Sequence, residues 1–170
     1  MRTLLLHALF SGAAVIRPPT PNDEMVTELA RAVGERARRK LGRSLAIREV
    51  DAGSCNGCEL EIHALNNPVY DIERFGLKFV ASPRHADVLL VTGPVSWNMR
   101  QALERTYAAT PEPKWVVAVG DCAAGCGVFA KSTACVGSVS AVIPVDIHIR
   151  GCPPPPTEIL KGLLALVEVC

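Results

Sequence analysis

Two runs made only of apolar residues do most to restrict the fold of this chain. They cover residues 88–91 (Val-Leu-Leu-Val), within a strand expected at residues 87–92, and Trp115–Val119, and neither run alternates with polar side chains. Continuous apolar strands are typical of a parallel sheet that helices cover on both faces. The alternation of strands and helices predicts an α/β fold with a doubly wound parallel sheet. The other strands are expected at residues 45–50, 77–81 and 145–149, and the helices at 59–66, from about residue 69, at 96–108 with Ser96 as its cap, and at 157–167.

The first 44 residues follow a different pattern. Residues 17–21 (Arg-Pro-Pro-Thr-Pro) predict an extended linker, because consecutive prolines exclude helix. Asn22 and Asp23 can then cap a helix that runs to about Leu41, with its acids early and its bases late, as the helix dipole favours. Its basic end favours a solvated helix terminus, with contact to anionic lipid as the alternative. We therefore divide the chain into an N-terminal extension at 1–44 and one domain at 45–170.

Residues 1–16 resemble a weak signal peptide, with one basic residue, an apolar stretch and small residues. His7 interrupts the apolar stretch, which is also too short for a membrane span of about 20 residues. No disulfide framework follows, since the cysteines number seven. The sequence favours a segment that lies on a membrane surface or on a partner subunit.

The overall charge and the aromatic content argue against a nucleic-acid partner. The formal net charge is +1, whereas nucleic-acid-binding domains carry a basic excess. Aromatic residues make up only 5% of the chain, too few for a surface on which bases stack.

Four of the seven cysteines are expected at the ends of three strands. Cys55 and Cys58 follow the strand at 45–50, Cys122 follows Trp115–Val119, and Cys152 follows the strand at 145–149, each in a turn that contains glycine. The carboxyl ends of parallel strands lie along one edge of the sheet, where such folds bind ligands. Four thiolates are the usual complement of a cubane iron–sulfur cluster. The sequence therefore predicts that these cysteines hold one such cluster.

Three other interpretations of these cysteines are less favourable. Zinc sites commonly use two close pairs of ligands in a short span, whereas here one pair is followed by single cysteines at positions 122 and 152. A thioredoxin-like redox pair would explain only Cys55 and Cys58. Ordinary buried cysteines would not all lie beside glycine or proline at strand ends. Cys126 could reach the same site if its turn became helical, while Cys135 and Cys170 are expected to be structural or incidental.

Six short motifs distinguish this chain from a generic α/β protein. They are Ser54-Cys-Asn-Gly-Cys-Glu-Leu-Glu-Ile62, Ser82-Pro-Arg-His-Ala-Asp87, Thr92-Gly-Pro-Val95, Gly120-Asp-Cys-Ala123, Ile143-Pro-Val-Asp-Ile147 and Gly151-Cys-Pro-Pro154. With them, the chain resembles the small subunit of membrane-bound, complex I-related NiFe hydrogenases (group 4, the formate hydrogenlyase and hydrogenase-4 type). More distantly, it resembles the 20 kDa complex I subunit that carries the terminal 4Fe-4S cluster. The Cys55-x-x-Cys58 spacing is similar to the hydrogenase branch, since the complex I subunit has its first two ligands adjacent.

The resemblance implies a flavodoxin-like fold and one proximal 4Fe-4S cluster on Cys55, Cys58, Cys122 and Cys152. It implies an electron-transfer subunit of a membrane-bound NiFe hydrogenase complex, an oxidoreductase subunit that is not catalytic alone. The implied partners are a large subunit with the nickel–iron centre (or a 49 kDa-like complex I subunit), a ferredoxin-like 4Fe-4S subunit and integral-membrane antiporter-like subunits. The implied location is peripheral, on the cytoplasmic face of the inner (plasma) membrane. A quinone-linked subunit of the complex I type is the alternative.

Several charged residues flank the expected ligands. Glu59 and Asp121 would lower the potential of a cluster if ionised, and Arg150 would raise it, although a solvated or paired charge is the favoured interpretation for each. Glu61 lies three residues beyond Cys58 on a short helix, facing back toward the cluster, and a glutamate occupies this position in the family motif. We treat a proton relay or a subunit contact as the hypothesis for Glu61. The sequence Ala124-Gly-Cys126-Gly127 departs from the small-residue run that follows the third ligand in the family.

Overall fold

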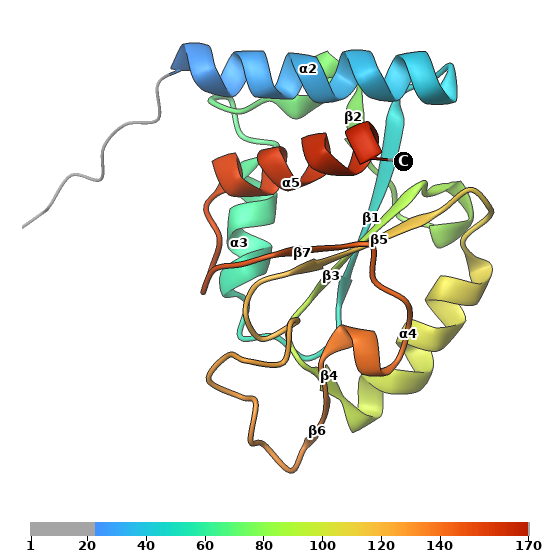
Figure 1. Cartoon of the computed structure of the whole chain (residues 1–170), viewed down its shortest axis with the longest axis vertical. Helices are drawn as coiled ribbons and strands as arrows, with labels where there is room; N and C mark the ends of the chain where they lie inside the picture. The colour runs from blue at the N-terminus through green and yellow to red at the C-terminus, as the bar shows by residue number, and fades with distance from the viewer. Residues whose placement is uncertain (1–22, 170) are drawn as a thin grey trace, which may run out of the picture.

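The computed structural model describes residues 23–169 and contains a five-stranded sheet in the order β2-β1-β3-β5-β7 (Figure 1). All four neighbouring pairs of strands are parallel. Counted within this sheet alone, the order is 2-1-3-4-5, which is the flavodoxin-like arrangement. The predicted doubly wound parallel sheet is therefore confirmed. The strands are β1 (Leu45–Asp51), β2 (Leu77–Phe79), β3 (Val88–Thr92), β5 (Trp115–Val119) and β7 (Ile147–Ile149).

Helices cover both faces of this sheet, as the apolar strands require. On one face lie α2 (Asp23–Leu41), α3 (Gly57–Ala64) and α5 (Pro156–Val169), and on the other lies α4 (Trp97–Ala109). Each face has its own buried cluster, and the five residues of β3 are all buried between the two clusters. Within residues 23–169, no helix is both long and apolar enough to cross a membrane.

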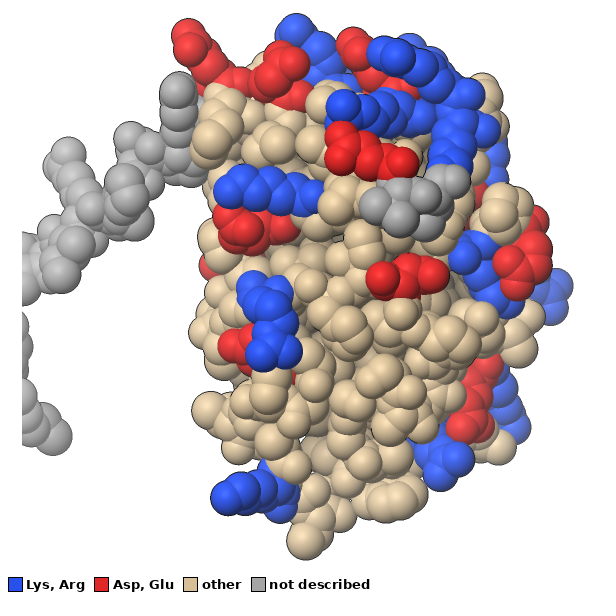
Figure 2. Space-filling model, in the orientation of Figure 1, with Lys and Arg blue, Asp and Glu red and all other residues tan. Residues whose placement is uncertain are grey.

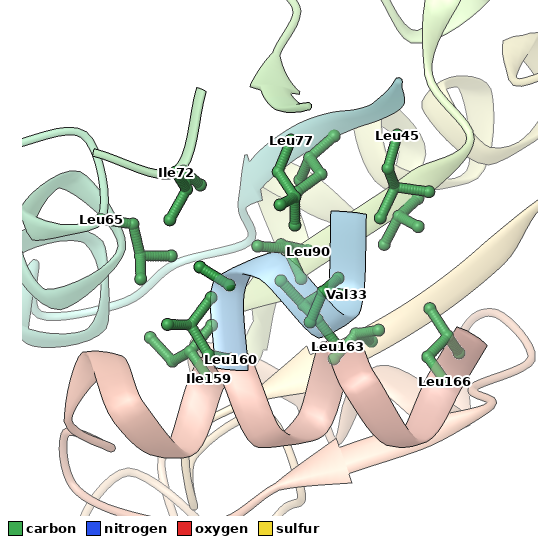
Figure 3. Packing of buried hydrophobic residues seen from close by; sticks show 14 of the residues in the cluster. Val33, Leu45, Leu65, Ile72, Leu77, Leu90, Ile159, Leu160, Leu163 and Leu166 are labelled. Atoms are coloured by element: carbon green, nitrogen blue, oxygen red, sulfur yellow. The ribbon is translucent and has the colours of Figure 1, made fainter. Parts of the chain in front are cut away.

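The face with three helices holds the larger core (Figure 3). Along α2, the buried residues Val26, Ala30, Val33 and Ala37 recur at helical spacing and form one stripe. This stripe packs against α5, whose buried Leu160, Leu163 and Leu166 lie between it and the sheet. The helical part of the predicted N-terminal extension thus shares its core with the rest of the chain. The division at residue 44 stays a prediction, and the linker, the signal-like segment and the Asn22 cap lie outside the described residues.

The prediction of a helix from about residue 69 is wrong. Only a 3-10 turn, η1 (Ile72–Phe75), forms in that region. The side chain of Asn67 accepts hydrogen bonds from the backbone N–H of Val69 (2.9 Å) and of Tyr70 (3.0 Å), which offers the backbone an alternative to helix. Asp71 then adopts the left-handed conformation with φ 40°, so an α-helix cannot continue through this residue.

Smaller differences concern element boundaries and one additional sheet. Helix α3 begins at Gly57, two residues before the expected start, so that Cys58 lies in its first turn. Strands β4 (Val95–Ser96) and β6 (Cys135–Gly137) pair antiparallel and were not predicted. Ser96 caps α4 as expected, because its hydroxyl accepts a hydrogen bond from the backbone N–H of Met99 at 3.3 Å.

Two carboxylates fix the edge of the sheet at which the strands begin, which we call the amino edge. Asp87, just before β3, accepts a hydrogen bond from the backbone N–H of Ala46 at 2.9 Å and pairs with Arg43 at 2.6 Å. Asp146, just before β7, accepts from the backbone N–H of Val116 at 2.7 Å. These contacts join segments more than 25 residues apart and set the register between neighbouring strands.

Candidate iron–sulfur site

The four predicted cysteines come together at the opposite edge, which we call the carboxyl edge. Cys55, Cys58, Cys122 and Cys152 all line one pocket with a volume of about 80 Å³. The loops that carry them follow β1, β5 and β7, as the sequence predicted. The remaining lining residues are small or turn-forming: Ser54, Gly57, Gly93, Asp121, Gly151 and Pro153.

The first cysteine loop is held in shape by the last residue of β1. One carboxylate oxygen of Asp51 accepts hydrogen bonds from the backbone N–H groups of Gly53 and Ser54, both at 2.8 Å. Asn56 adopts the left-handed conformation with φ 69° and turns the chain directly into α3. The result places Cys55 before the helix and Cys58 in its first turn, both facing the pocket.

The turns of Cys122 and Cys152 are joined to each other. The backbone N–H of Asp121 donates to the carbonyl of Gly151 at 2.8 Å, and the backbone N–H of Gly151 donates to the Asp121 carboxylate at 3.2 Å. Arg150 pairs with the same carboxylate at 3.1 Å. The interpretation of Asp121 and Arg150 as paired charges is confirmed, and their opposite effects on a nearby redox group partly cancel.

Glycine is required where the chain passes the cysteine sulfurs. A Cβ added to Gly120 would lie 2.6 Å from the Sγ atom of Cys58, and Gly120 also has φ +92°. A Cβ on Gly127 would overlap the Sγ atom of Cys122. These glycines let the backbone approach the sulfurs closely, so no side chain intrudes at these points. The donor set and its cradle fit a group held by four thiolates.

Burial raises the pKa of two of these thiols, Cys58 and Cys122. Burial raises the pKa of the Cys58 thiol to about 12, with further contributions from Glu59 and from the other three cysteines. Burial also raises the pKa of Cys122, while hydrogen bonding by the backbone of Phe129 acts in the opposite direction. Four thiolates at this spacing repel one another. Iron cations would offset that repulsion and replace the protons.

A zinc ion and a cubane cluster require different spacings of their thiolate ligands. Within residues 23–169, no three His, Cys, Asp or Glu side chains lie close enough to share one metal ion. Tetrahedral zinc needs its sulfurs about 3.8 Å apart, given Zn–S bonds of about 2.3 Å. A cubane carries its thiolates on four separate iron atoms and so spreads them more widely.

One acidic residue at this edge was interpreted wrongly from the sequence. Glu59 is 5% exposed, and neither of its carboxylate oxygens has a hydrogen-bond partner among the described residues. The expectation of a solvated or paired charge does not hold for it. Glu59 also raises the pKa of the half-buried Glu49, although burial of Glu49 is the larger cause. Glu59 lies in the first turn of α3, directly after Cys58, and no local pattern indicates that its side chain is buried.

Glu61 and Cys126 do not line the cysteine pocket. Glu61 is partly buried and lies close enough to Tyr70 to raise the pKa of its phenol, though burial of Tyr70 has the larger effect. Cys126 is exposed, and its thiol donates to the carbonyl of Asp121 at 3.3 Å. Cys135 belongs to β6, and Cys170 lies outside the described residues. The relay hypothesis for Glu61 stays a prediction.

Apolar side chains are exposed close to the pocket. Leu60 follows Cys58 by two residues, and Val128 and Phe129 follow Gly127, which packs on Cys122. Figure 2 shows a large, mostly uncharged area toward the end of the molecule where β4, β6 and the loop between β5 and β6 lie. Exposed apolar surface of this kind is typical of a contact with another protein.

Comparison with known proteins gives consistent relatives. The family model described as "NADH ubiquinone oxidoreductase, 20 Kd subunit" matches residues 55–166. A probable membrane-bound hydrogenase subunit of Pyrococcus furiosus is 48% identical over 128 residues, which cover 75% of this chain and 77% of that protein. Formate hydrogenlyase subunit 7 of Escherichia coli is 44% identical over 133 residues, covering 76% of this chain and 52% of that protein.

Relatives from respiratory complexes match nearly as well. An NADH-quinone oxidoreductase subunit of Heliobacterium modesticaldum is 44% identical over 110 residues, covering 64% of this chain and 63% of that protein. Among solved structures, a chain of the membrane-bound sulfane sulfur reductase, an archaeal respiratory membrane complex, superposes with a TM-score of 0.67 at 33% identity. That superposition covers 81% of this chain and 75% of the other.

Proposed function

This chain belongs to the family of the 20 kDa subunit of NADH–ubiquinone oxidoreductase, and from that premise we propose that it holds one 4Fe-4S cluster on Cys55, Cys58, Cys122 and Cys152. Its relatives are named as subunits of a membrane-bound hydrogenase, of formate hydrogenlyase and of an NADH-quinone oxidoreductase, which supports an electron-transfer role. The observation that carries the proposal is the pocket lined by all four thiols, which come from three separate loops.

The hydrogenase branch is the favoured setting. Cys55 and Cys58 are separated by two residues, the spacing of the hydrogenase small subunit, and two relatives named for hydrogen metabolism match at 44% identity or more. In this setting the proximal cluster passes electrons between the nickel–iron centre of a large subunit and a ferredoxin-like subunit. A quinone-linked subunit of the complex I type is the second candidate, because a relative named as an NADH-quinone oxidoreductase subunit is 44% identical.

Each part of the chain has a defined task at such a site. When bound, a 4Fe-4S cluster accepts and releases single electrons. The thiolates of the four cysteines hold it, and the backbone of Phe129 and Val128 hydrogen-bonds to the Cys122 sulfur and stabilises its negative charge. The contacts between Asp121 and Gly151 hold the third and fourth ligands at a fixed separation. The buried Glu59 disfavours an added electron when it is ionised.

The proposed partners fit the surface around the pocket. The exposed Leu60, Val128 and Phe129 provide an apolar contact for a large subunit, placed beside the cluster as electron transfer requires. Ferredoxin-like and integral-membrane antiporter-like subunits complete the proposed complex, on the cytoplasmic face of the membrane. Glu61 remains a proposed relay or contact residue; Glu61→Gln should slow proton-coupled turnover with the cluster signal intact, and unchanged turnover would exclude the relay.

The cysteine assignment is tested in the intact purified complex. Cys152→Ser should remove the electron paramagnetic resonance signal of one cluster and about four iron atoms per complex. Cys135→Ser is the matched control, since Cys135 lies in β6 and does not line the pocket. Nickel content and hydrogen exchange measured on the same sample separate the hydrogenase from the quinone-linked candidate. Zinc without a reducible cluster in the unaltered complex would overturn the proposal.

A further inference from the structure

A groove lined by arginines lies on the side of α2 that faces solvent. It has a volume of about 210 Å³ and runs between α2 and η1. Three of its six lining residues are arginines and only one is acidic. The lining residues are Arg31, Gly34, Glu35, Arg38, Arg74 and Phe75.

Close packing of the two elements brings these arginines together. A Cβ on Gly34 would overlap the carbonyl of Phe75, so α2 lies directly against η1 only because residue 34 is glycine. Arg31 and Arg38 are two helical turns apart and share one side of α2. The backbone contact places Arg74 of η1 next to that side, and a guanidinium nitrogen of Arg38 reaches within 3.6 Å of the Cβ position of Gly76.

The carboxylates near the groove hold these arginines only weakly. Arg31 is 3.9 Å from Glu28 and Arg74 is 3.6 Å from Asp71, and all four side chains are largely exposed. Such exposed pairs contribute little free energy. Glu35 contacts Arg39 at 3.4 Å. Among residues 23–169, Arg38 has no carboxylate within salt-bridge distance, so the groove keeps a positive excess.

Other basic residues follow near the end of α2, but Arg36 pairs with Glu168 of α5 and Arg43 pairs with Asp87, so the positive excess belongs to the groove itself. Residues 36–43 contain Arg36, Arg38, Arg39, Lys40 and Arg43 and no acidic residue. Figure 2 shows many lysine and arginine side chains, with acidic side chains among them, at the end of the molecule formed by α2, in contrast to the mostly uncharged area at the far end of the same view. Guanidinium groups bind phosphate oxygens in pairs, and a surface with several of them is attracted to anionic lipid.

We propose that the groove between α2 and η1 binds phosphate headgroups of an anionic membrane and seats the amino-edge side of the subunit on the lipid. Charge complementarity carries this choice of occupant, because three exposed guanidinium groups and only one carboxylate line the groove. The cysteine pocket would then face away from the lipid, since it lies at the opposite edge of the sheet.

Vesicle binding by the full chain tests this proposal. The probe is a vesicle of phosphatidylcholine with one third phosphatidylglycerol, and pure phosphatidylcholine is the reference. The triple variant Arg31→Gln, Arg38→Gln, Arg74→Gln should bind anionic vesicles about a hundred-fold more weakly, at about five-fold per arginine. Binding of the unaltered chain should weaken as salt rises from about 0.05 to 0.5 M.

A matched variant distinguishes lipid binding by the groove from an effect of net charge alone. Arg84→Gln, Arg105→Gln, Lys131→Gln removes the same charge from positions outside the groove and should bind nearly as well as the unaltered chain. Residues 1–16 are identical in all three proteins, so their own affinity for lipid cancels. Equal losses in both variants, or equal binding to neutral vesicles, would overturn the proposal. The proposal would also be overturned if substitution of the groove arginines released a protein subunit from the complex. It would equally be overturned if free inorganic phosphate bound in the groove while the chain did not bind vesicles.

Discussion

The two edges of the sheet are built in opposite ways. At the amino edge, long-range contacts are made by side chains: the carboxylates of Asp87 and Asp146 each fix the backbone of a neighbouring strand. At the carboxyl edge, glycines let the loops pass close to the cysteine sulfurs, and the side chain of Asp121 links the turns of Cys122 and Cys152. The difference indicates that the amino edge contributes stability, whereas the carboxyl edge is kept open for a bound group.

One glycine at each edge of the sheet shows the same difference between the two edges. Gly42 near the amino edge and Gly120 at the carboxyl edge both have positive φ, at 68° and 92°. A Cβ on Gly42 would meet nothing within 4 Å, while one on Gly120 would meet the Sγ atom of Cys58. Both positions carry a conformational requirement, but only Gly120 also has a steric one imposed by the site.

The largest effect is expected for Gly120→Ala. The added methyl group must displace the Cys58 sulfur, and the backbone strain adds about 1–2 kcal/mol. We expect cluster affinity to fall about 10- to 100-fold, measured as iron and acid-labile sulfide per purified chain. Gly42→Ala is the control with similar strain and no contact, and it should keep its cluster. Equal cluster loss in both variants would show that strain alone is responsible.

The second effect is the loss of stability on replacing Asp87. Asp87→Ala leaves the buried N–H of Ala46 and the guanidinium of Arg43 without their acceptor. The free energy of unfolding should fall by about 2 kcal/mol, measured by urea denaturation, while the cluster spectrum of the folded fraction stays unchanged. Arg43→Gln should cost less, because Arg43 is largely exposed and the contact with Ala46 survives. A changed spectrum in Asp87→Ala would mean that the two edges are coupled.

The sequence could predict the features that depend on residues close together in the chain or on the sheet topology. The apolar strand Trp115–Val119 was predicted to the residue, since continuous apolarity is a local signal. The convergence of Cys58, Cys122 and Cys152 was also predicted, because parallel topology alone brings strand ends together. The prediction failed at residues 69–75, where the side chain of Asn67 outweighs the local helical pattern.

Other features depend on three-dimensional contacts that leave no sequence pattern. The hydrogen bond between Asp87 and Ala46 joins residues 41 positions apart, and nothing local distinguishes Asp87 from a solvated acid. The burial of Glu59 depends on which side of the short helix α3 packs against the rest of the molecule, and eight residues give no clear periodicity from which to infer that side. Strands of two or three residues, such as β4 and β6, are too short for any periodicity to indicate.

A third, intermediate effect is expected for Asp121, whose carboxylate joins the turns of Cys122 and Cys152. Asp121→Ala removes the acceptor for the Gly151 N–H and for Arg150 but leaves the backbone contact to the Gly151 carbonyl. We expect a loss of about 1 kcal/mol in stability and faster release of iron to a chelator. Arg150→Gln keeps the carboxylate and should release iron more slowly than Asp121→Ala. Identical release rates would show that the ion pair, rather than the hydrogen bond to Gly151, holds the two turns together.

The smallest effect at neutral pH concerns the thiols of the metal-free chain. The pKa of Cys58 is raised to about 12 in the folded state, mainly by burial, and its ordinary value is 9.0. A group with a raised folded pKa contributes stability that is fully present below the unfolded value, so the metal-free chain should lose stability only as pH rises above about 9. Urea denaturation between pH 7 and about 11 measures this loss, and Cys58→Ser should reduce it.

Alkylation rates of the same thiols then decide whether the carboxyl edge is formed before metal binds. Iodoacetamide attacks the thiolate, so Cys58 should react far more slowly than the exposed Cys55 at pH 8, and its rate should still be rising about tenfold per unit above pH 10. The two residues are three positions apart, so a difference in rate reflects the folded pocket rather than local sequence. Equal rates across the pH range would mean that the cysteine loops take this arrangement only around a cluster. In that case the amino edge alone would be preformed, and the contrast between the edges would be one of folding order as well as of construction.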